Sequence, residues 1–285
     1  MILLEVRGPY DFKATVQPHR LGPLDPTVRT TPTSIVKAVH GPDGVVVVHG
    51  FHRLERAAIE VVLEGPGSAW MEPLLPAFFG LHDDVPFQPT DVHPLARQLA
   101  ATGRGLRLAR APTLYDRHAG FVLQQRVTFT EAARVWRAIH LRHGAAAPGA
   151  AGEQGVRVPL SAPQWRQVSS AELQSLGVDQ KRWVALQEAM RAARHVEAAA
   201  GDHERLREVL TAIHGTGVWT SECVLGFGAG DADAVQVGDV HLAPTVTKAF
   251  DGVPRQSDER MLALLEPYRG NRFRIIRWLL GARYG

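Results

Sequence analysis

The pattern of hydrophobic and polar positions changes in character near residue 90. Before this point, apolar residues alternate with polar ones, which is the period of a half-buried strand. Ser34–His40 and Val45–Phe51 flank a Gly-Pro-Asp-Gly turn and predict a β-hairpin. The same pattern predicts strands over Phe12–Gln17 and Ala58–Glu64. We therefore expect a small antiparallel sheet in the first part of the chain.

Helical spacing appears at the end of this part and dominates after it. Trp70–Leu81 predicts a helix, because Trp70, Leu74, Ala77 and Phe78 fall on one side. After residue 94, helical patterns cover Ala119–Leu141, Ser169–Gly177, Gln180–Ala200, Leu206–Ile213, Asp258–Leu265 and Arg272–Leu280. The stretch from 144 to 155 consists mostly of small residues and predicts a loop without a packing role.

Length and composition fit this division. With 285 residues and 45% hydrophobic composition, the chain can build one large core or two modest ones. We expect a mainly α fold, in which a small α+β domain with an antiparallel sheet (residues 1–90) precedes an all-α domain (residues 91–285). We expect this all-α domain to consist of two helical subdomains with a cleft between them.

Other features exclude several classes of protein. The N-terminus, MILLEVRGPYDF, has no long apolar run and reaches Pro9 early, so we expect neither a signal peptide nor a membrane anchor. The expected location is the cytoplasm of a bacterium, in association with the nucleoid. Cys223 is the single cysteine, which leaves no disulfide framework and no four-cysteine iron–sulfur cluster. Among the 13 histidines, His49 and His52 lack a third partner for a metal.

Arginines are distributed unevenly, although the net charge is only +3. Residues 91–144 hold nine arginines against three acids, and residues 267–285 hold five arginines and no acid. Together these two regions predict one surface for phosphates. Each arginine taken singly is better explained as a solvated side chain, and a G+C-rich genome also favours arginine, so this pattern only supports a nucleic-acid partner.

The most specific chemistry lies in Leu210–Lys248. A Gly-Thr-Gly turn, Gly215–Gly217, separates two apolar-periodic segments, and its glycines allow positive φ and the close approach of a partner. The amides of Gly217, Trp219 and Thr220 would open the second segment, where unpaired N–H groups and the helix dipole favour an anion. By itself such a turn is often only a turn.

Asp239 follows this turn and is the residue that we expect to be catalytic. It lies nineteen residues beyond Thr220. A buried carboxylate can stabilise an oxocarbenium-like sugar, as in glycoside hydrolysis, and can orient the attacking water. Asp is also a favoured N-cap, so Asp239 can cap a helix that begins near Val240. The two roles are compatible.

The turn and the aspartate together resemble the helix-hairpin-helix motif of the HhH-GPD DNA glycosylase superfamily, with the hairpin at about residues 206–227. Members that also cleave the strand carry a lysine where this chain has Trp219, and an indole cannot form a Schiff base. The resemblance therefore narrows to the AlkA-type 3-methyladenine DNA glycosylase II branch, which the phrase RLGPLDPT (20–27) also fits. It implies a monofunctional enzyme that excises alkylated purines and starts base excision repair, without lyase activity.

The resemblance also assigns a wedge and a base pocket. Gln125 and Arg126 match the segment in which a glutamine precedes the side chain that fills the hole left by an extruded base. Arg126 departs from the apolar wedge of AlkA, and a solvent-facing arginine is the alternative. The pocket residues would be Trp219, Cys223 in place of a tyrosine, and Trp278. Both tryptophans can instead be packing residues.

A cation and a partner follow from the resemblance alone. The backbone carbonyls of Thr211, Ile213 and Thr216 would hold a structural monovalent or other cation beside the phosphate. No other cofactor is expected. The expected partner is double-stranded DNA that contains a damaged base, bound by a monomer that needs no membrane.

Three other functions compete with this interpretation. A glycosylase for oxidised, deaminated or mismatched bases fits the same residues, since Trp219 excludes only the lysine mechanism. A non-catalytic damage-binding protein would need neither Asp239 nor the Gln125–Arg126 pair. A sugar hydrolase with paired carboxylates lacks a candidate partner near Asp239 in the sequence. Which damaged base is preferred stays open.

Overall fold

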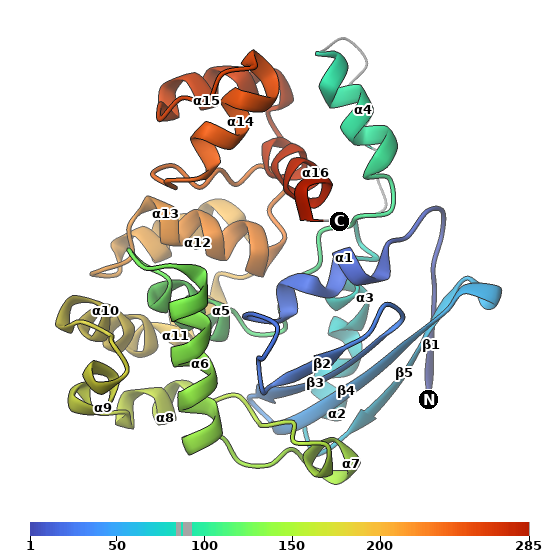
Figure 1. The fold of residues 1–285 in the computed structure, drawn as a ribbon. Helices are drawn as coiled ribbons and strands as arrows, with labels where there is room; N and C mark the ends of the chain where they lie inside the picture. The colour runs from blue at the N-terminus through green and yellow to red at the C-terminus, as the bar shows by residue number, and fades with distance from the viewer. Residues whose placement is uncertain (84–86, 88–92, 285) are drawn as a thin grey trace.

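The computed structural model describes residues 1–83, 87 and 93–284, with 282–284 as backbone only. Five strands form one antiparallel sheet in the order β1-β5-β4-β3-β2. Their bounds are β1 Ile2–Glu5, β2 Val28–Thr30, β3 Ser34–Gly41, β4 Gly44–Arg53 and β5 Ala58–Glu64. The sheet lies at one side of the molecule and helices form the rest (Figure 1). The predicted fold class, mainly α with a small N-terminal sheet, is confirmed.

The predicted hairpin is also confirmed. β3 and β4 pair in a register that places Gly41 opposite Gly44, so Pro42 and Asp43 form the loop. Gly44 has a φ of +113°, which glycine adopts without steric cost. The predicted strand Ala58–Glu64 is β5 with the same bounds, and it pairs with β4 and β1.

The predicted strand over Phe12–Gln17 is wrong, because this segment is helical. α1 spans Phe12–Val16 and leads into a short 3-10 helix, η1, at Gln17–His19. The Asp11 side chain begins α1 by accepting the Ala14 N–H at 2.9 Å. α1 buries Phe12, Thr15 and Val16. These positions have helical spacing, which the alternation of apolar residues concealed.

The predicted helix over Trp70–Leu81 is interrupted. It consists of α2, η3 and α3, with bounds Ser68–Met71, Glu72–Leu74 and Leu75–Phe78. Pro73 and Pro76 lie in the first turns of η3 and α3. Proline has no N–H for a helical hydrogen bond, so it is tolerated at the start of a helix and ends a preceding one.

The remaining chain folds into further helices. Their bounds are α4 Pro94–Thr102, α5 Leu114–Leu123, α6 Phe129–His143, α7 Gly149–Glu153, α8 Ala162–Gln167, α9 Ser170–Ser175, α10 Gln180–Arg191, α11 Ala193–Ala198, α12 His203–Ala212, α13 Val218–Cys223, α14 Leu242–Asp251, α15 Asp258–Leu265 and α16 Arg272–Tyr284. A π-helix, η4, continues α13 over Val224–Ala229, and 3-10 helices lie at Leu54–Arg56 (η2) and Glu266–Tyr268 (η5). The predicted bounds of α15 are confirmed, and each of the other predicted helical stretches overlaps helices.

The long helix predicted over Ala119–Leu141 is two helices, α5 and α6. Between them Arg126 has a φ of +59°, which an α-helix does not allow. Thr128 then begins α6 with a capping box: its side chain bonds to the backbone N–H of Glu131, whose carboxylate accepts the Thr128 N–H. The sequence Thr-x-x-Glu carried this signal inside an otherwise continuous apolar pattern.

The small-residue stretch from 144 to 155 has a packing role, contrary to prediction. It contains α7, and Ala147 and Ala151 are buried in a cluster with Ala38 and Val47 of the sheet. An isolated bridge joins Ala146 to Arg157. Small side chains let this segment approach the sheet closely, which a count of apolar residues does not reveal.

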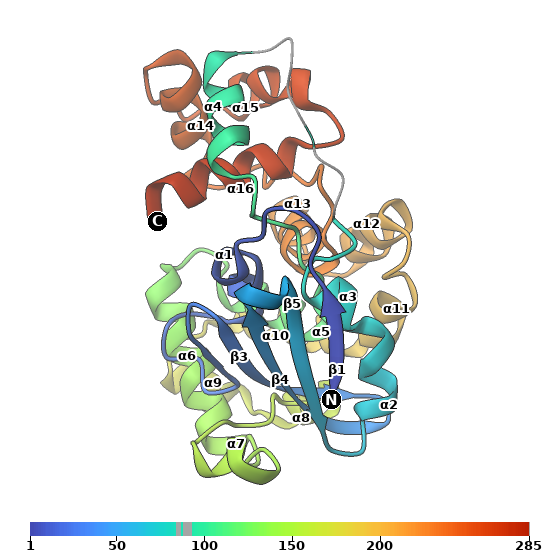
Figure 2. The ribbon, with the colours of Figure 1, turned by 90° about the vertical axis from the view of Figure 1, so that its right-hand side faces the viewer.

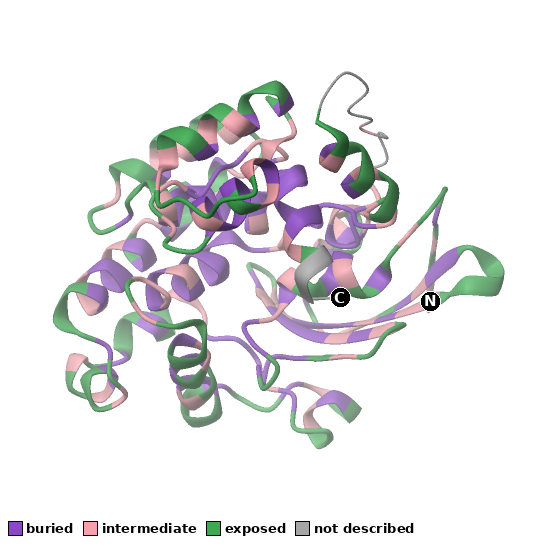
Figure 3. Cartoon of the chain, turned by 45° about the horizontal axis from the view of Figure 1, so that its top comes forward, coloured by how far each residue is buried: buried purple, intermediate pink, exposed green. Residues whose placement is uncertain are grey.

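Two hydrophobic cores lie among the helices. One is built mainly by α4, α12, η4 and α14–α16, and the other by α5, α6 and α8–α10. A third lies between the sheet and α1–α3. Figure 2 shows helices α4 and α14–α16 above the sheet. Figure 3 shows the buried residues, in purple, inside the molecule. The domain boundary predicted between residues 90 and 91 lies outside the described residues.

None of the helices in the described part of the chain is both long and apolar enough to cross a lipid bilayer.

Candidate active site

α12 and α13 form a helical hairpin whose turn covers residues 213–217 (Figure 1). Gly215 has a φ of +82°, and a Cβ at this position would lie 2.4 Å from the Cβ of Ala185. Gly217 differs, because its φ is −82° and a Cβ there would meet nothing within 4 Å. Only the first glycine of the turn is therefore required by the protein's own backbone.

The start of α13 offers unpaired backbone amides. Among the residues that the structure describes, the N–H groups from Gly217 to Thr220 donate no backbone hydrogen bond, whereas Ser221 donates to Gly217. Gly217 and Val218 are exposed. An anion can therefore approach these amides without displacing a side chain.

Asp239 and Trp219 are brought together at this end of the hairpin. The Trp219 indole N–H donates to Oδ2 of Asp239 at 2.8 Å. The other carboxylate oxygen accepts the backbone N–H groups of His241 and Leu242, at 2.8 and 3.0 Å. Asp239 thus caps the first turn of α14, which begins at Leu242 rather than near Val240. These three bonds fix the orientation of a half-buried carboxylate.

A chain of aromatic side chains that the sequence did not single out leads away from Trp219. Phe121 of α5 packs edge-to-face on its indole, with ring centroids 6.3 Å apart. Phe227 of η4 lies 5.9 Å from Phe121, and Phe273 of α16 lies 4.9 Å from Phe227. The glycines on either side of Phe227 permit this, because a Cβ at Gly226 would lie 2.7 Å from the Phe273 ring.

The structure does not bring Trp278 to this group. Trp278 is buried against Gly103, and its ring stacks on Phe87 with centroids 6.2 Å apart. This is the core-packing alternative left open above. Cys223 does lie near Asp239: burial, with the charges of Asp239 and Glu222, raises the pKa of its thiol well above the usual value. Cys223 is therefore a buried, neutral thiol.

Arg277 of α16 lies beneath the aromatic group. Its guanidinium stacks on Phe227, 5.3 Å from the ring centroid, and donates to the Ala14 carbonyl of α1 at 3.1 Å. Burial lowers the pKa of Arg277 to about 10. No described carboxylate forms an ion pair with it, so it adds an uncompensated positive charge next to Phe227.

The Gln125–Arg126 turn lies against the hairpin. The Gln125 amide group donates to the Gly215 carbonyl and to the Thr220 hydroxyl, each at 2.9 Å. Arg126 is exposed, and no hydrogen bond or ion pair joins its side chain to another described residue. Gln125 thus fixes the turn, and Arg126 projects from it unpaired.

α5 is tied to the hairpin and to α11 by buried groups. His118 shares a hydrogen bond of 2.8 Å with the Thr216 hydroxyl, and burial lowers the pKa of His118 to about 4. At the other end, Glu197 accepts the N–H groups of Leu114 and Tyr115 at 2.6 and 2.8 Å. Burial raises the pKa of Glu197 to about 7. Both contacts hold the helix that carries Phe121.

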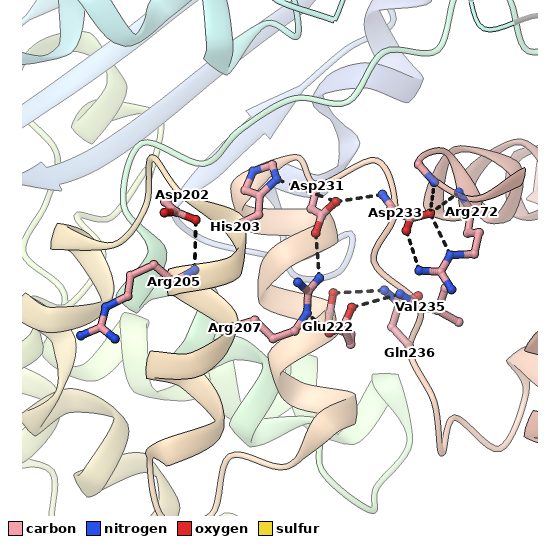
Figure 4. A network of polar contacts seen from close by, with 11 residues as sticks. Asp202, His203, Arg205, Arg207, Glu222, Asp231, Asp233, Val235, Gln236 and Arg272 are labelled. Carbon is pink, nitrogen blue, oxygen red and sulfur yellow. Dashed lines mark hydrogen bonds and ion pairs between the residues drawn. The ribbon is translucent and has the colours of Figure 1, made fainter.

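A network of ion pairs holds the loop that leads to Asp239 (Figure 4). Arg207 of α12 bonds to Glu222 of α13 at 2.7 Å and to Asp231 at 2.9 Å. Glu222 also accepts the Val235 N–H at 3.1 Å, and its backbone carbonyl accepts the Gln236 side chain at 3.1 Å. The hairpin and the aspartate loop are therefore one connected unit.

The predicted cation ligands lie at the end of α12 and in the turn. The Ile213 carbonyl already accepts the Thr216 N–H at 3.0 Å, which leaves one lone pair free. The Thr211 carbonyl lies at the negative end of the α12 dipole. Carbonyl oxygens suit a hard cation, so the residues fit the predicted group. The cation itself stays a prediction. Within the described residues, no cluster of three or more His, Cys, Asp or Glu side chains could hold a metal ion.

Four of the five C-terminal arginines are paired with carboxylates or buried, which does not support the predicted phosphate surface. Arg272 pairs with Asp233, Arg274 with Asp83 and Arg269 with Glu266. Arg277 is buried, and the side chain of Arg283 lies outside the described residues. Within residues 91–144, Arg107 and Arg117 are buried as well.

No protein-family model matches the sequence, and no curated protein matches it. Solved structures do match. The 3-methyladenine DNA glycosylase from Archaeoglobus fulgidus superposes with a TM-score of 0.79 at 18% identity, covering 100% of this chain and 99% of that one. The 8-oxoguanine glycosylase/lyase of Clostridium acetobutylicum, in complex with double-stranded DNA, gives 0.71 at 12% identity, covering 96% and 92%.

A third match is the 3-methyladenine DNA glycosylase of Schizosaccharomyces pombe in complex with abasic DNA, with a TM-score of 0.54 at 16% identity, covering 72% of this chain and 96% of that one. The matches thus include glycosylases for alkylated and for oxidised bases. The chain has, over its whole length, the fold of the helix-hairpin-helix DNA glycosylases.

Proposed function

We propose that this chain is a DNA glycosylase, which extrudes a damaged base from double-stranded DNA and hydrolyses its N-glycosidic bond. The observation that carries the proposal is the 2.8 Å bond between the Trp219 indole and the Asp239 carboxylate. It fixes an acid beside the free amides of α13, which suit a DNA phosphate. A protein that only binds DNA does not need this carboxylate.

Asp239 supplies negative charge where the sugar becomes positive as the base leaves. Its one remaining lone pair, on Oδ2, can accept a hydrogen bond from the attacking water. Because three donors already hold the carboxylate, it needs little reorganisation during the reaction. Arg126, which projects unpaired from its turn, is the group that fills the space of the extruded base.

The proposed enzyme is monofunctional. A lyase needs an amine that attacks the sugar, and the position after Val218 is Trp219. The chain has four lysines, and none lies on α12, α13 or η4: they are Lys13, Lys37, Lys181 and Lys248. Hydrolysis without strand cleavage therefore fits the site best.

Alkylated purines are the first proposed substrate class. Trp219, Phe121 and Phe227 offer electron-rich faces to a cationic base, and each such contact contributes about 0.5–2 kcal/mol. Arg277 favours a second candidate. Its guanidinium already occupies one face of Phe227 and repels a cation, whereas a neutral oxidised or deaminated base offers carbonyl oxygens that tolerate it.

Release of free base from duplexes tests the proposal. Methylated, oxidised and deaminated duplexes are incubated with wild type and with Asp239→Asn, and the bases and strands are identified. We expect base release without strand cleavage in wild type, and retained binding with at least a hundredfold slower release in the variant. No release from any duplex would refute the function. Strand cleavage without heat or alkali would refute the monofunctional assignment.

Asp202→Asn is the matched control. Asp202 also caps a helix, since its side chain accepts the Arg205 N–H at 3.0 Å, but it lies at the far end of α12. If both variants lost activity equally, a general effect on helix capping would explain the loss, and Asp239 would have no special part in it.

A further inference from the structure

A pocket lies in the N-terminal part of the molecule, between α1 and the end of β2. Its volume is about 170 Å³. It is lined by Lys13, Gln17, Arg20, Thr30, Thr31 and Pro32. This is smaller than the 300 Å³ or more of typical sites for small organic molecules, so it suits a compact polar group.

The lining of this pocket is basic and contains no acid. Lys13 is exposed, and Arg20 donates to the Thr30 hydroxyl at 3.3 Å. No ion pair joins Lys13 or Arg20 to a carboxylate of the described residues. The C-terminal arginines Arg272 and Arg274, in contrast, are neutralised by acids. Two cations and two hydroxyls around a small hollow provide donors for an anion.

The pocket is connected to the candidate active site by direct contacts. The Ala14 carbonyl of α1 accepts the Arg277 guanidinium, which stacks on Phe227 beneath the aromatic group. The chain that follows Arg20 packs against α6. A Cβ at Gly22 would lie 2.9 Å from the Cβ of Ala133, which shows how closely the two segments approach. α1 and α6 lie on the left in Figure 2, and α11 and α12 lie on the right.

We propose that this pocket binds a phosphate of the DNA backbone, away from the phosphate at the hairpin. Arg126 lies just before α6, and α1 with its pocket lies on the same side of the molecule as α6 (Figure 2), so a duplex that contacts Arg126 can run along this side toward the pocket. Lys13 and Arg20 neutralise the phosphate, and the Thr30 and Thr31 hydroxyls donate to its oxygens. The N-terminal part thereby takes part in DNA binding. This inference rests on the proposed function.

The test measures affinity for an undamaged duplex over a range of salt concentrations, for wild type and for Lys13→Gln/Arg20→Gln. One lost phosphate contact lowers the slope of log affinity against log salt by about 1. We expect this change, with an unchanged single-turnover rate of base release at saturating DNA. The control, Arg166→Gln/Arg194→Gln, removes two exposed arginines on α8 and α11, and we expect it to leave the slope unchanged.

Each outcome bears on the proposal in one direction. An unchanged slope in the double variant, while wild type still releases base, overturns the pocket and leaves the enzyme function intact. Absence of base release in wild type overturns the function instead. A second arm titrates inorganic phosphate alone. If only wild type binds it and the DNA slope is equal in both, the pocket serves free phosphate and the proposal is wrong.

Discussion

Gly215 and Gly217 lie two positions apart and are glycines for different reasons. At Gly215, a φ of +82° and the Ala185 side chain exclude a Cβ. At Gly217 neither the backbone nor a neighbour excludes one. Since the fold does not require a glycine at position 217, we attribute this glycine to the close approach of the phosphate in the proposed function.

Alanine substitutions separate the two reasons. Gly215→Ala should lower the free energy of unfolding by about 1–3 kcal/mol, because it adds strain and a steric clash. Gly217→Ala should change stability by less than about 0.5 kcal/mol, as exposed substitutions usually do, but should weaken binding to duplex DNA severalfold. Urea unfolding and a DNA titration measure both. Equal DNA affinity of Gly217→Ala and wild type would contradict the assignment.

Arg126 permits a similar separation. A non-glycine residue in the left-handed region costs about 1–2 kcal/mol, and Arg126 has a φ of +59°. Arg126→Gly should therefore be as stable as wild type or more so, while its affinity for a damaged duplex falls. The rate on a single-stranded substrate, which has no hole to fill, should change less. Equal losses on both substrates would remove the wedge assignment.

The sequence identified residues that act through their spacing and missed those that act through packing. Asp239 and Trp219 lie at short, fixed distances from a glycine turn, and Gln125 lies in a short segment that resembles the family's, so local patterns locate them. Phe121 and Phe227 come from helices that meet only in the folded chain, and nothing local distinguishes them from core residues. Trp278 was assigned to the pocket through the resemblance alone, and it packs against Gly103.

At the scale of elements, the ion pairs between α12, α13 and the aspartate loop position Asp239 without touching the proposed substrate. Glu222→Gln removes the negative charge that pairs with Arg207, and it leaves one side-chain oxygen to accept from both Arg207 and Val235. A hydrogen bond to a charged group contributes about 1.5–3 kcal/mol, so we expect base release to slow by tenfold or more. Glu208→Gln, which breaks an exposed pair with Arg205, is the control.

Elements were predicted well where one signal dominated. The β3–β4 hairpin and β5 follow from clear alternation between turn residues, and α15 follows from a single apolar face. The prediction failed where two signals competed. The Asp11 cap overrode the alternation in α1, and the capping box at Thr128 interrupted an apolar pattern that alone gives one long helix.

At the scale of the whole molecule, the sequence did not predict which charged side chains form ion pairs. The partner of Arg272 lies 39 residues away in the sequence and that of Arg274 lies 191 residues away. Composition counts both arginines as free. Their pairing with Asp233 and Asp83 became visible only after the chain had folded.

Stability of the whole molecule should depend on pH through Glu197. Its pKa in the folded protein is raised to about 7 from 4.5, so the folded state keeps a proton that the unfolded state releases between these values. The resulting stabilisation is present at low pH and is lost as the pH rises to 7. Its size is on the order of 3 kcal/mol.

Glu197→Gln isolates this effect, because glutamine is neutral at every pH and still accepts the amides of α5. Buried His19 and His118, whose folded pKa values are lowered to about 3 and about 4, act in the opposite direction and cancel in the comparison. The free energy of unfolding in urea is measured for wild type and variant. From pH 5 to pH 8 the wild type should lose stability relative to the variant. A difference that does not vary with pH would contradict it.

The π-helix that follows α13 makes the site sensitive to chain length. In η4, Val224–Ala229, each turn holds more residues than in an α-helix. If the same residues took α-helical geometry instead, the wide turn would no longer absorb its extra residue, and the chain beyond would be rotated by about 100°. Phe227 would turn away from Phe121, and the loop carrying Asp239 would be displaced from Trp219. A single-residue insertion here, which adds such a rotation to a turn that is already wide, should therefore be far more harmful than any conservative substitution in the same helix.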